Sequence, residues 1–440
     1  MTDRILCTVA TALGKSTPIV QNDHDYAVRV LNHQISAELC ADIRAFSPAA
    51  FGVTDYFKKV VDDFKVAPGE TPAGYRVEYK LGEDNVLRAD LHRDISYEKN
   101  GLKRPTNVLF SADSANPYEV EHVKDMISNL TCNPAIIYNM FLNNPQANVG
   151  GKFKDRDEVM RAIGDMLGPG CDISVELNDP FSSSESEILE EAARFKEILG
   201  EHRVIIKVPH TGAVNAKNVS ELMTGDKLFS RRYNQGTVED YFRGHNMALM
   251  LHEHGYRVNF TLMFEPYQTQ LALQARPTFI NSFVMFRQEQ STQMSSLCTA
   301  WEETGDKLYL EQLREYMVKN DYLSSAEAGC DLSFAYIRAR DVLKYRGYYH
   351  NPNADGLDGI RHNLRVLRDA NLPDTRLIIC NFQSEYVYPY VDRMLMEPEF
   401  KDMTDRVVVT APPALLGEYT TNALVTQFHR RFMNAANGAK

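Results

Sequence analysis

A lysine interrupts an otherwise apolar segment, Val204-Ile205-Ile206-Lys207-Val208-Pro209. The segment has the composition of a fully buried strand, and charged side chains are rarely buried without a reason. An apolar pocket favours the neutral form of an amine, and a neutral amine attacks carbonyl carbons. On this pattern alone a solvent-exposed lysine at a strand end is the more common arrangement. The other strand-like segments are therefore needed to choose between an exposed and a buried lysine.

Polar side chains also stand near the ends of three other strand-like segments. Asp113 and Glu176 each close a run of mostly apolar residues, whereas Asn259 and Thr261 alternate with apolar residues. If these segments are parallel strands of one barrel, their ends meet Lys207 on a single face. An amine, two carboxylates and amide or hydroxyl groups suit proton transfer around a carbonyl.

The segments that carry these residues belong to a regular alternation of strand-like and helical patterns. The strand-like segments are Asn107–Phe110, Ser128–Thr131, Asp172–Leu177, Arg203–Val208, Arg257–Leu262, Thr278–Phe286, Thr375–Asn381 and Arg406–Thr410. Eight such units predict an α/β protein with a (β/α)8 TIM barrel, and a doubly wound open sheet is the alternative.

The first part of the chain has a different pattern, so we expect an N-terminal extension over residues 1–104 and the barrel over residues 105–440. Helical periodicity occurs around Tyr26–Ile43 and again over Asp55–Phe64. The charged stretch Leu87–Lys103 shows no clear core pattern. The extension is therefore predicted to be mainly helical.

Two long insertions follow predicted strands. One runs from Gly212 to about Arg243 and holds the basic pair Arg231-Arg232, and the other runs from Gln288 to about Lys344 with a helical pattern. Because both leave carboxyl ends of strands, they would stand on the active-site face as lids or partner surfaces. A decorative insertion, or a contact in a homo-oligomer, is an equally open alternative.

Composition restricts the partners and the compartment. The net charge of −11 argues against nucleic-acid and anionic-membrane partners, and no run of 18 apolar residues or signal peptide is present. The seven cysteines are odd in number and include no C-x-x-C pair. We therefore expect no disulfide framework, no metal site and a reducing compartment, with the cytoplasm as the default location.

Five motifs, in order along the chain, resemble those of the transaldolase family. They are Leu130-Thr131-Cys132-Asn133-Pro134, Ser174-Val175-Glu176, Ile206-Lys207-Val208-Pro209-His210-Thr211, Val258-Asn259-Phe260-Thr261-Leu262-Met263-Phe264 with Gln268, and Ala411-Pro412-Pro413-Ala414-Leu415-Leu416. The resemblance spans about residues 107–425, and the lysine and asparagine–proline motifs are its most specific parts.

The resemblance implies a catalytic set without metal or cofactor. Lys207 would attack a ketose carbonyl, and Asp113 would take the proton from the hydroxyl beyond the scissile bond. Glu176 and Thr261 would hold the water that relays protons. The iminium cation would draw electrons from the breaking carbon–carbon bond.

The resemblance also implies substrate contacts, and the sequence departs from the family at some of them. The implied positions are Asn133 and Asn259 for hydroxyls, and Asn281, Arg287, Asn381 and Gln383 at or near the family's phosphate-binding positions. The family has serine where Asn281 stands and arginine where Gln383 stands, and Arg287 comes one residue late. An arginine–phosphate hydrogen bond contributes about 1.5–3 kcal/mol, so a sugar phosphate would lose affinity unless Arg231 or Arg232 replaces the lost cation.

These residues predict a transaldolase-like transferase that moves a dihydroxyacetone unit from a ketose, phosphorylated or not, to an aldehyde. One alternative is an aldolase acting on a non-phosphorylated ketose. The other is a catalytically inactive barrel that serves as a binding or scaffold protein. The small-molecule sugar or sugar phosphate is the expected partner.

Overall fold

The structure is a computed structural model that describes residues 7–182, 184–200, 204–225, 227, 235–348, 355–380 and 387–438. The chain divides into two compact units. The first unit comprises Met1–Leu109 with Asp165–Asp172, and the second comprises Phe110–Gly164 with Ile173–Lys440. Each unit is described by itself.

The second unit is built on a closed barrel of eight strands in the order β10-β11-β4-β5-β6-β7-β8-β9. The strands are β4 (Leu109–Asp113), β5 (Ile127–Cys132), β6 (Asp172–Glu176), β7 (Val204–Pro209), β8 (Arg257–Thr261), β9 (Phe279–Phe283), β10 (Arg376–Cys380) and β11 (Val407–Ala411). The recorded pairings along the barrel are parallel. The predicted (β/α)8 barrel is confirmed, and the open-sheet alternative is wrong.

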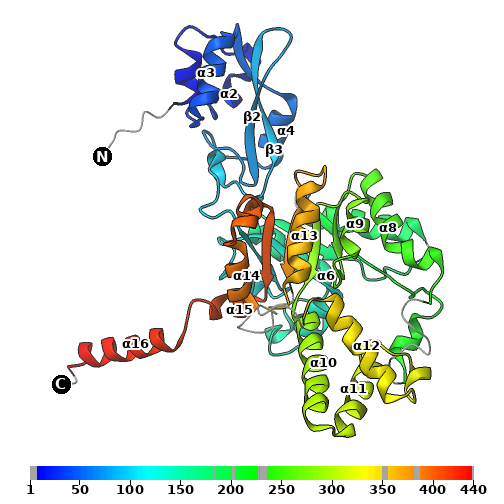
Figure 1. The fold of residues 1–440 in the computed structure, drawn as a ribbon. Helices are drawn as coiled ribbons and strands as arrows, with labels where there is room; N and C mark the ends of the chain where they lie inside the picture. The colour runs from blue at the N-terminus through cyan, green and yellow to red at the C-terminus, as the bar shows by residue number, and fades with distance from the viewer. Residues whose placement is uncertain are drawn as a thin grey trace. The chain divides into compact units, whose positions relative to one another are not determined.

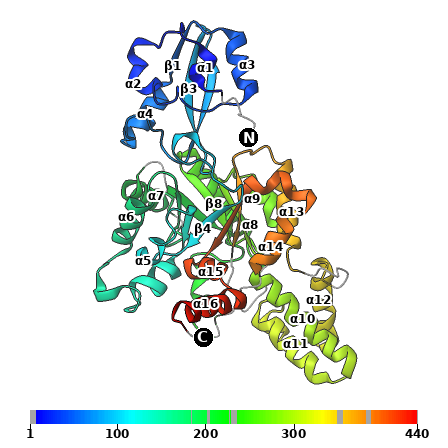
Figure 2. The same ribbon diagram turned by 90° about the vertical axis from the view of Figure 1, so that its left-hand side faces the viewer.

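Helices connect the strands and surround them in Figures 1 and 2. They are α5 (Pro117–Val120), the π-helix Ala135–Leu142, α6 (Arg156–Leu167), α7 (Glu185–Leu199), α8 (Val238–Glu253), α9 (Gln268–Leu273), α13 (Asp358–Asp369), α14 (Val387–Leu395) and α15 (Pro413–Glu418), with 3-10 helices at Val149–Gly151, Val219–Met223 and Pro398–Arg406. Strand β7 is buried along its whole length, as expected of a parallel strand covered by helices.

Several strand bounds differ from the prediction by one to three residues, and the difference at β9 changes the type of an element. The segment Thr278–Phe286 was expected to be a single strand, but β9 ends at Phe283 and α10 (Met285–Thr304) begins two residues later. The apolar residues around this junction are compatible with a buried strand and with a buried helix, so their periodicity could not locate it. Arg287 therefore lies in the first turn of a helix.

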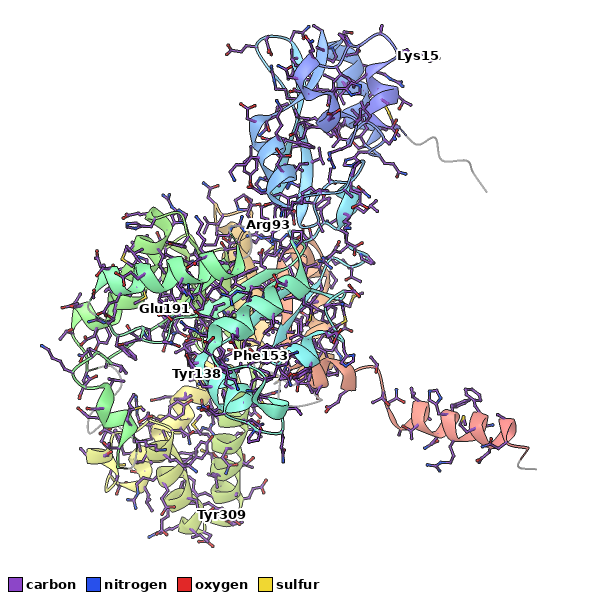
Figure 3. The ribbon with its side chains drawn as sticks, turned by 180° about the vertical axis from the view of Figure 1, so that it is seen from behind. Lys15, Arg93, Tyr138, Phe153, Glu191 and Tyr309 are labelled. Carbon is purple, nitrogen blue, oxygen red and sulfur yellow. A yellow bond between two sulfur atoms is a disulfide. The ribbon has the colours of Figure 1, made fainter. Side chains whose placement is uncertain are left out.

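The insertion after β9 is helical, as predicted. It contains α10, α11 (Lys307–Lys319) and α12 (Leu332–Tyr345), with the 3-10 helix Ser325–Glu327 between the last two. These helices lie together in Figure 1, and Tyr309 of α11 is labelled in Figure 3. They enclose a separate apolar core that includes Met294, Leu313, Met317 and Leu343.

The first unit contains the expected helices and a sheet that was not expected. Its elements are α1 (Val9–Leu13), a 3-10 helix (Gln21–Asp23), α2 (His24–Ala27), α3 (Ala37–Phe46), β1 (Ala50–Val53), α4 (Asp55–Asp63), β2 (Tyr75–Leu81), β3 (Val86–Arg93) and a 3-10 helix (Lys99–Gly101). Strand β3 is central, parallel to β1 and antiparallel to β2. Leu87, Ala89 and Leu91 of β3 are buried. The charged residues between them hid this alternation in the sequence.

The predicted helical region Tyr26–Ile43 is two helices rather than one. Helix α2 ends at Ala27, and α3 begins at Ala37 after Ser36, whose side chain accepts a hydrogen bond from the Leu39 amide. A serine in this position favours the start of a new helix. The apolar periodicity continued across the connection and concealed the break.

Cys7 and Cys40 form a disulfide, which the expectation of no disulfide framework did not foresee. The two residues are 33 positions apart, and the Ile35 amide donates to the Cys7 carbonyl beside them. Folding thus brings together cysteines that show no local spacing motif. The inference of a reducing compartment loses the support that it drew from unpaired cysteines.

The last helix, α16 (Ala423–Ala436), has no buried residue. Asn422 caps it by accepting hydrogen bonds from the Leu424 and Val425 amides. In the described part of the chain, no helix combines the length and apolar character needed to cross a membrane.

Substitution of Phe195 tests the packing of α7 on the barrel. Phe195 is fully buried, and the Arg156 guanidinium lies 4.4 Å from its ring centroid. We expect Phe195→Ala to lower the free energy of unfolding by about 3–5 kcal/mol, because it removes a ring and leaves a cavity. Phe195→Leu should cost clearly less. Urea unfolding followed by circular dichroism measures both, and an unchanged stability of Phe195→Ala would contradict this packing.

Candidate active site

Lys207 belongs to β7 and lies inside the barrel, where the residue is 5% exposed. Its Nζ is 3.3 Å from Oε2 of Glu176 and donates a hydrogen bond of 3.4 Å to the carbonyl of Cys132. Glu176 is the partner of Lys207 in the β6–β7 register. The strand register therefore holds the amine beside a carboxylate, as the sequence predicted.

Two further predicted site residues, Asn259 and Thr261, lie on β8, the strand next to that of Lys207. Asn259 is the register partner of Lys207, and Thr261 is the partner of Pro209. Residues paired across parallel strands point to the same side of a sheet, and residues two apart along a strand do so as well. Asn259 is fully buried and Thr261 is 1% exposed, so both belong to the barrel interior beside the lysine.

Asp113 completes a charged group from the other side of the barrel. It ends β4, where it is the register partner of Thr131 on β5. Burial and the charge of Glu176 raise the pKa of Asp113 to about 6, against the opposing effect of Lys207. The three groups therefore interact with one another, and we call Asp113, Glu176 and Lys207 the charge cluster.

The charge state of Lys207 differs from the expectation of a neutral amine. Burial acts to lower its pKa, but the nearby charges of Glu176 and Asp113 outweigh burial, and the pKa of Lys207 is raised. The sequence analysis considered desolvation alone. The amine of the free site is thus an ammonium that must lose a proton before it can attack a carbonyl.

A layer of polar side chains lies beneath the charge cluster and was not predicted. Asn129 donates to Ser111 at 2.8 Å and accepts from Ser174 at 3.2 Å, and all three are fully buried. Each stands two residues before Asp113, Thr131 or Glu176, and so points to the same interior face. The alternation Ser-x-Asp, Asn-x-Thr and Ser-x-Glu was the available sequence signal.

Asn281 positions Asn259. Its Nδ2 donates to Oδ1 of Asn259 and, at 2.8 Å, to the carbonyl of Phe260. The Nδ2 of Asn259 and the hydroxyl of Thr131 are buried and have no hydrogen-bond partner among the described residues. Both can therefore bind a polar group of a ligand, and Thr131 is a candidate that the sequence analysis did not single out.

The remaining predicted contacts have different positions. Asn133 follows β5, and its Oδ1 accepts a 2.9 Å hydrogen bond from the Ile136 amide at the start of the π-helix. Asn381, Gln383 and the pair Arg231-Arg232 lie outside the described residues.

Arg287 is enclosed by carboxylates. It is 4% exposed, its Nε lies 3.0 Å from Glu265, and its Nη1 donates to Asp358. Arg346 also donates to Glu265 and to the carbonyl of Arg287. Burial lowers the pKa of Arg287, but Asp358 and Glu265 outweigh burial and raise it. The charge of this guanidinium is therefore already compensated within the protein.

The loop after β8 is fixed by Gln268. Its Oε1 accepts from the amides of Phe264 and Glu265, and its Nε2 donates to the carbonyl of Leu262. Leu262 has a φ of +57°, which is uncommon for a residue other than glycine. These bonds hold the loop at the carboxyl end of β8 and place Glu265 beside Arg287 and Arg346.

Among the described residues, no group of three or more His, Cys, Asp or Glu side chains could hold a metal ion.

Substitution of Glu176 tests the electrostatics of the cluster. We expect Glu176→Gln to lower the pKa of Lys207, because burial then acts against a weaker opposing charge. The pH dependence of Lys207 carbamylation by cyanate, quantified by mass spectrometry, reports this pKa. Glu253→Gln, on the exposed end of α8, is the matched control. An unchanged or higher Lys207 pKa in Glu176→Gln would show that the carboxylate does not hold the ammonium.

Comparison with known proteins agrees with this geometry. Residues 110–308 match the family model described as Transaldolase/Fructose-6-phosphate aldolase. The matched part contains β5 to β9 and all three residues of the charge cluster. No curated protein matches the chain significantly. The match over residues 110–308 confirms the resemblance to the transaldolase family that the sequence motifs indicated.

Proposed function

We propose that this protein transfers a dihydroxyacetone unit from a ketose to an aldehyde through a Schiff base on Lys207. The family match over residues 110–308 supports a transaldolase-like function at the coarser level. The observation that carries the finer proposal is the buried amine of Lys207, held 3.3 Å from Glu176 with the Asp113 carboxyl in the same cluster. No other arrangement in the described barrel combines a sheltered amine with two carboxyl groups.

The first step is formation of the Schiff base. Lys207 gives its proton to Glu176, the carboxylate that already contacts it, and the neutral amine attacks the ketose carbonyl. The carbonyl oxygen leaves as water after taking two protons, one from the attacking nitrogen and one from Glu176. Thr261, which lies in the adjacent strand, can hold this water for proton relay. The product is an iminium ion that joins Lys207 to the substrate.

The second step is carbon–carbon bond cleavage. Asp113 takes the proton of the hydroxyl beyond the scissile bond, and the electron pair of that bond moves into the iminium. An aldehyde leaves, and a three-carbon enamine stays on Lys207. A pKa of about 6 suits Asp113 to this exchange, because the group can accept a proton near neutral pH and return it later.

The fate of the enamine separates transferase from aldolase. Attack on a second aldehyde returns the proton from Asp113 to the new hydroxyl and gives a new ketose after hydrolysis. Protonation of the enamine followed by hydrolysis releases dihydroxyacetone, which is the aldolase alternative. The inactive-scaffold alternative is less well supported. A buried charge cluster lowers the folding stability, and a non-catalytic barrel would gain nothing in return.

We further propose that the preferred ketose carries no phosphate. Arg287 is ion-paired with Glu265 and Asp358, so a phosphate would meet a guanidinium whose charge is already compensated, with two carboxylates of like charge beside it. The other buried cations named at this site, Lys207 and Arg346, are paired with carboxylates as well. The hydroxyl-binding amides of Asn133 and Asn259 would instead hold an uncharged carbon chain.

Borohydride trapping tests the Schiff base. We expect dihydroxyacetone with borohydride to add one reduced three-carbon unit, located on Lys207 by mass spectrometry, because reduction fixes the iminium. Lys207→Ala should give no adduct, and Lys196→Ala, at an exposed position of α7, should react like the parent chain. An adduct that persists in Lys207→Ala would exclude the proposed nucleophile.

Substrate preference tests the missing phosphate site. We expect kcat/KM for fructose cleavage to equal or exceed that for fructose 6-phosphate. Asp358→Asn should move the ratio toward the phosphorylated ketose, by up to about ten-fold, because it removes one carboxylate from Arg287. Asp369→Asn, at the exposed end of the same helix, is the control. Strict dependence of the parent chain on phosphate would refute this part of the proposal.

A further inference from the structure

The first unit contains a cavity of about 600 Å³. Small-molecule sites in proteins commonly measure about 300–1,000 Å³. Its walls come from the connection between α2 and α3, the start of α3, strand β2 and the segment 97–102. Figure 1 shows these helices and β2 in one unit, and Figure 3 labels Lys15 and Arg93 of the same unit. The barrel chemistry makes no use of this cavity.

Three residues that line the cavity each have a buried polar atom without a hydrogen-bond partner among the described residues. These atoms are Nε of Arg29, Nε2 of His33 and the hydroxyl of Tyr79. Buried polar groups in proteins are almost always hydrogen-bonded. The gathering of their residues in the lining of one cavity indicates a site able to bind the polar part of a ligand.

The lining carries positive charge. It includes Arg29 and Arg76 but no aspartate or glutamate, although the whole chain has a net charge of −11. Arg76 is paired with Glu78 at 2.7 Å. Arg29 makes no ion pair with any described residue, and its Nη1 donates to the carbonyls of residues 66, 67 and 70. Those bonds fix the guanidinium in place without cancelling its charge.

The other groups restrict the ligand to a single negative charge. Burial raises the pKa of Tyr79, so its hydroxyl keeps its proton and can donate. Burial lowers the pKa of His33, so its imidazole stays neutral near pH 7. The lining also offers an apolar surface, made of Val28, Ile35, Leu39, Val77 and Leu102, and the ring of Tyr97.

We propose that this cavity binds a small organic carboxylate with an aromatic or apolar body. The carboxylate accepts hydrogen bonds from the Arg29 guanidinium and the Tyr79 hydroxyl. The body of the molecule packs on the apolar surface and on Tyr97. The site is separate from the Schiff-base chemistry at Lys207, so it gives the first unit a binding function of its own.

Calorimetric titration of the full chain with 2-naphthoate and its uncharged isostere 2-naphthamide tests the proposal. We expect naphthoate to bind at least about ten-fold more tightly, because only it forms a charge-assisted hydrogen bond with Arg29. Arg29→Gln should abolish this preference, and Tyr79→Phe should weaken naphthoate several-fold. Arg44→Gln, at an exposed position of α3, is the control. Lys207→Ala should bind naphthoate like the parent chain.

A second measurement does not depend on how the variants fold. Benzophenone-4-carboxylate is photolysed with the parent chain, and the labelled peptides are mapped by mass spectrometry. We expect labels in residues 28–39 and 76–102, suppressed by excess naphthoate. No saturable naphthoate binding, equal affinity for the amide, or labels confined to the barrel would each overturn the proposal.

Discussion

The barrel depends on the attraction between a buried ammonium and two carboxyl groups. Burial acts to lower the pKa of Lys207, and the opposing charges of Glu176 and Asp113 outweigh burial and raise it. A buried charge is tolerated only when it is paired, and loss of one partner leaves an uncompensated charge. The surrounding architecture serves this balance, because the β6–β7 register aligns the ion pair and the Ser111–Asn129–Ser174 layer supports it from below.

A second buried ionic group lies at the start of α10 and has the opposite consequence. In the charge cluster, a proton can pass from the amine to a carboxylate when a carbonyl arrives. Around Arg287, the guanidinium stays charged, and Glu265 and Asp358 compensate it. Arg346, from the end of α12, bonds both Glu265 and the Arg287 carbonyl. The helical insertion thus helps to hold Arg287 in ion pairs, which is the basis of the proposal that the preferred ketose carries no phosphate.

The sequence predicted those features that residues close together along the chain determine. The strands were visible as apolar runs, and Lys207 stood out because it interrupted one of them. The sheet of the first unit was missed because Arg88 and Asp90 alternate with its buried residues. The partner of Arg287 at position 358 lies 71 residues away, and the Cys7–Cys40 pair spans 33. No spacing motif in the sequence predicts either contact. The charge of Lys207 could not be predicted either, because it depends on the carboxylates that folding places beside it.

The pH dependence of kcat/KM for ketose cleavage tests the charge cluster most directly. Asp113 must be ionised to accept the hydroxyl proton, and its pKa in the free site is about 6. The rate constant should therefore rise with pH and level off above an apparent pKa near this value. A rate constant that stays level from pH 7 down to pH 5 would show that the buried carboxyl does not take the proton, and would contradict the account.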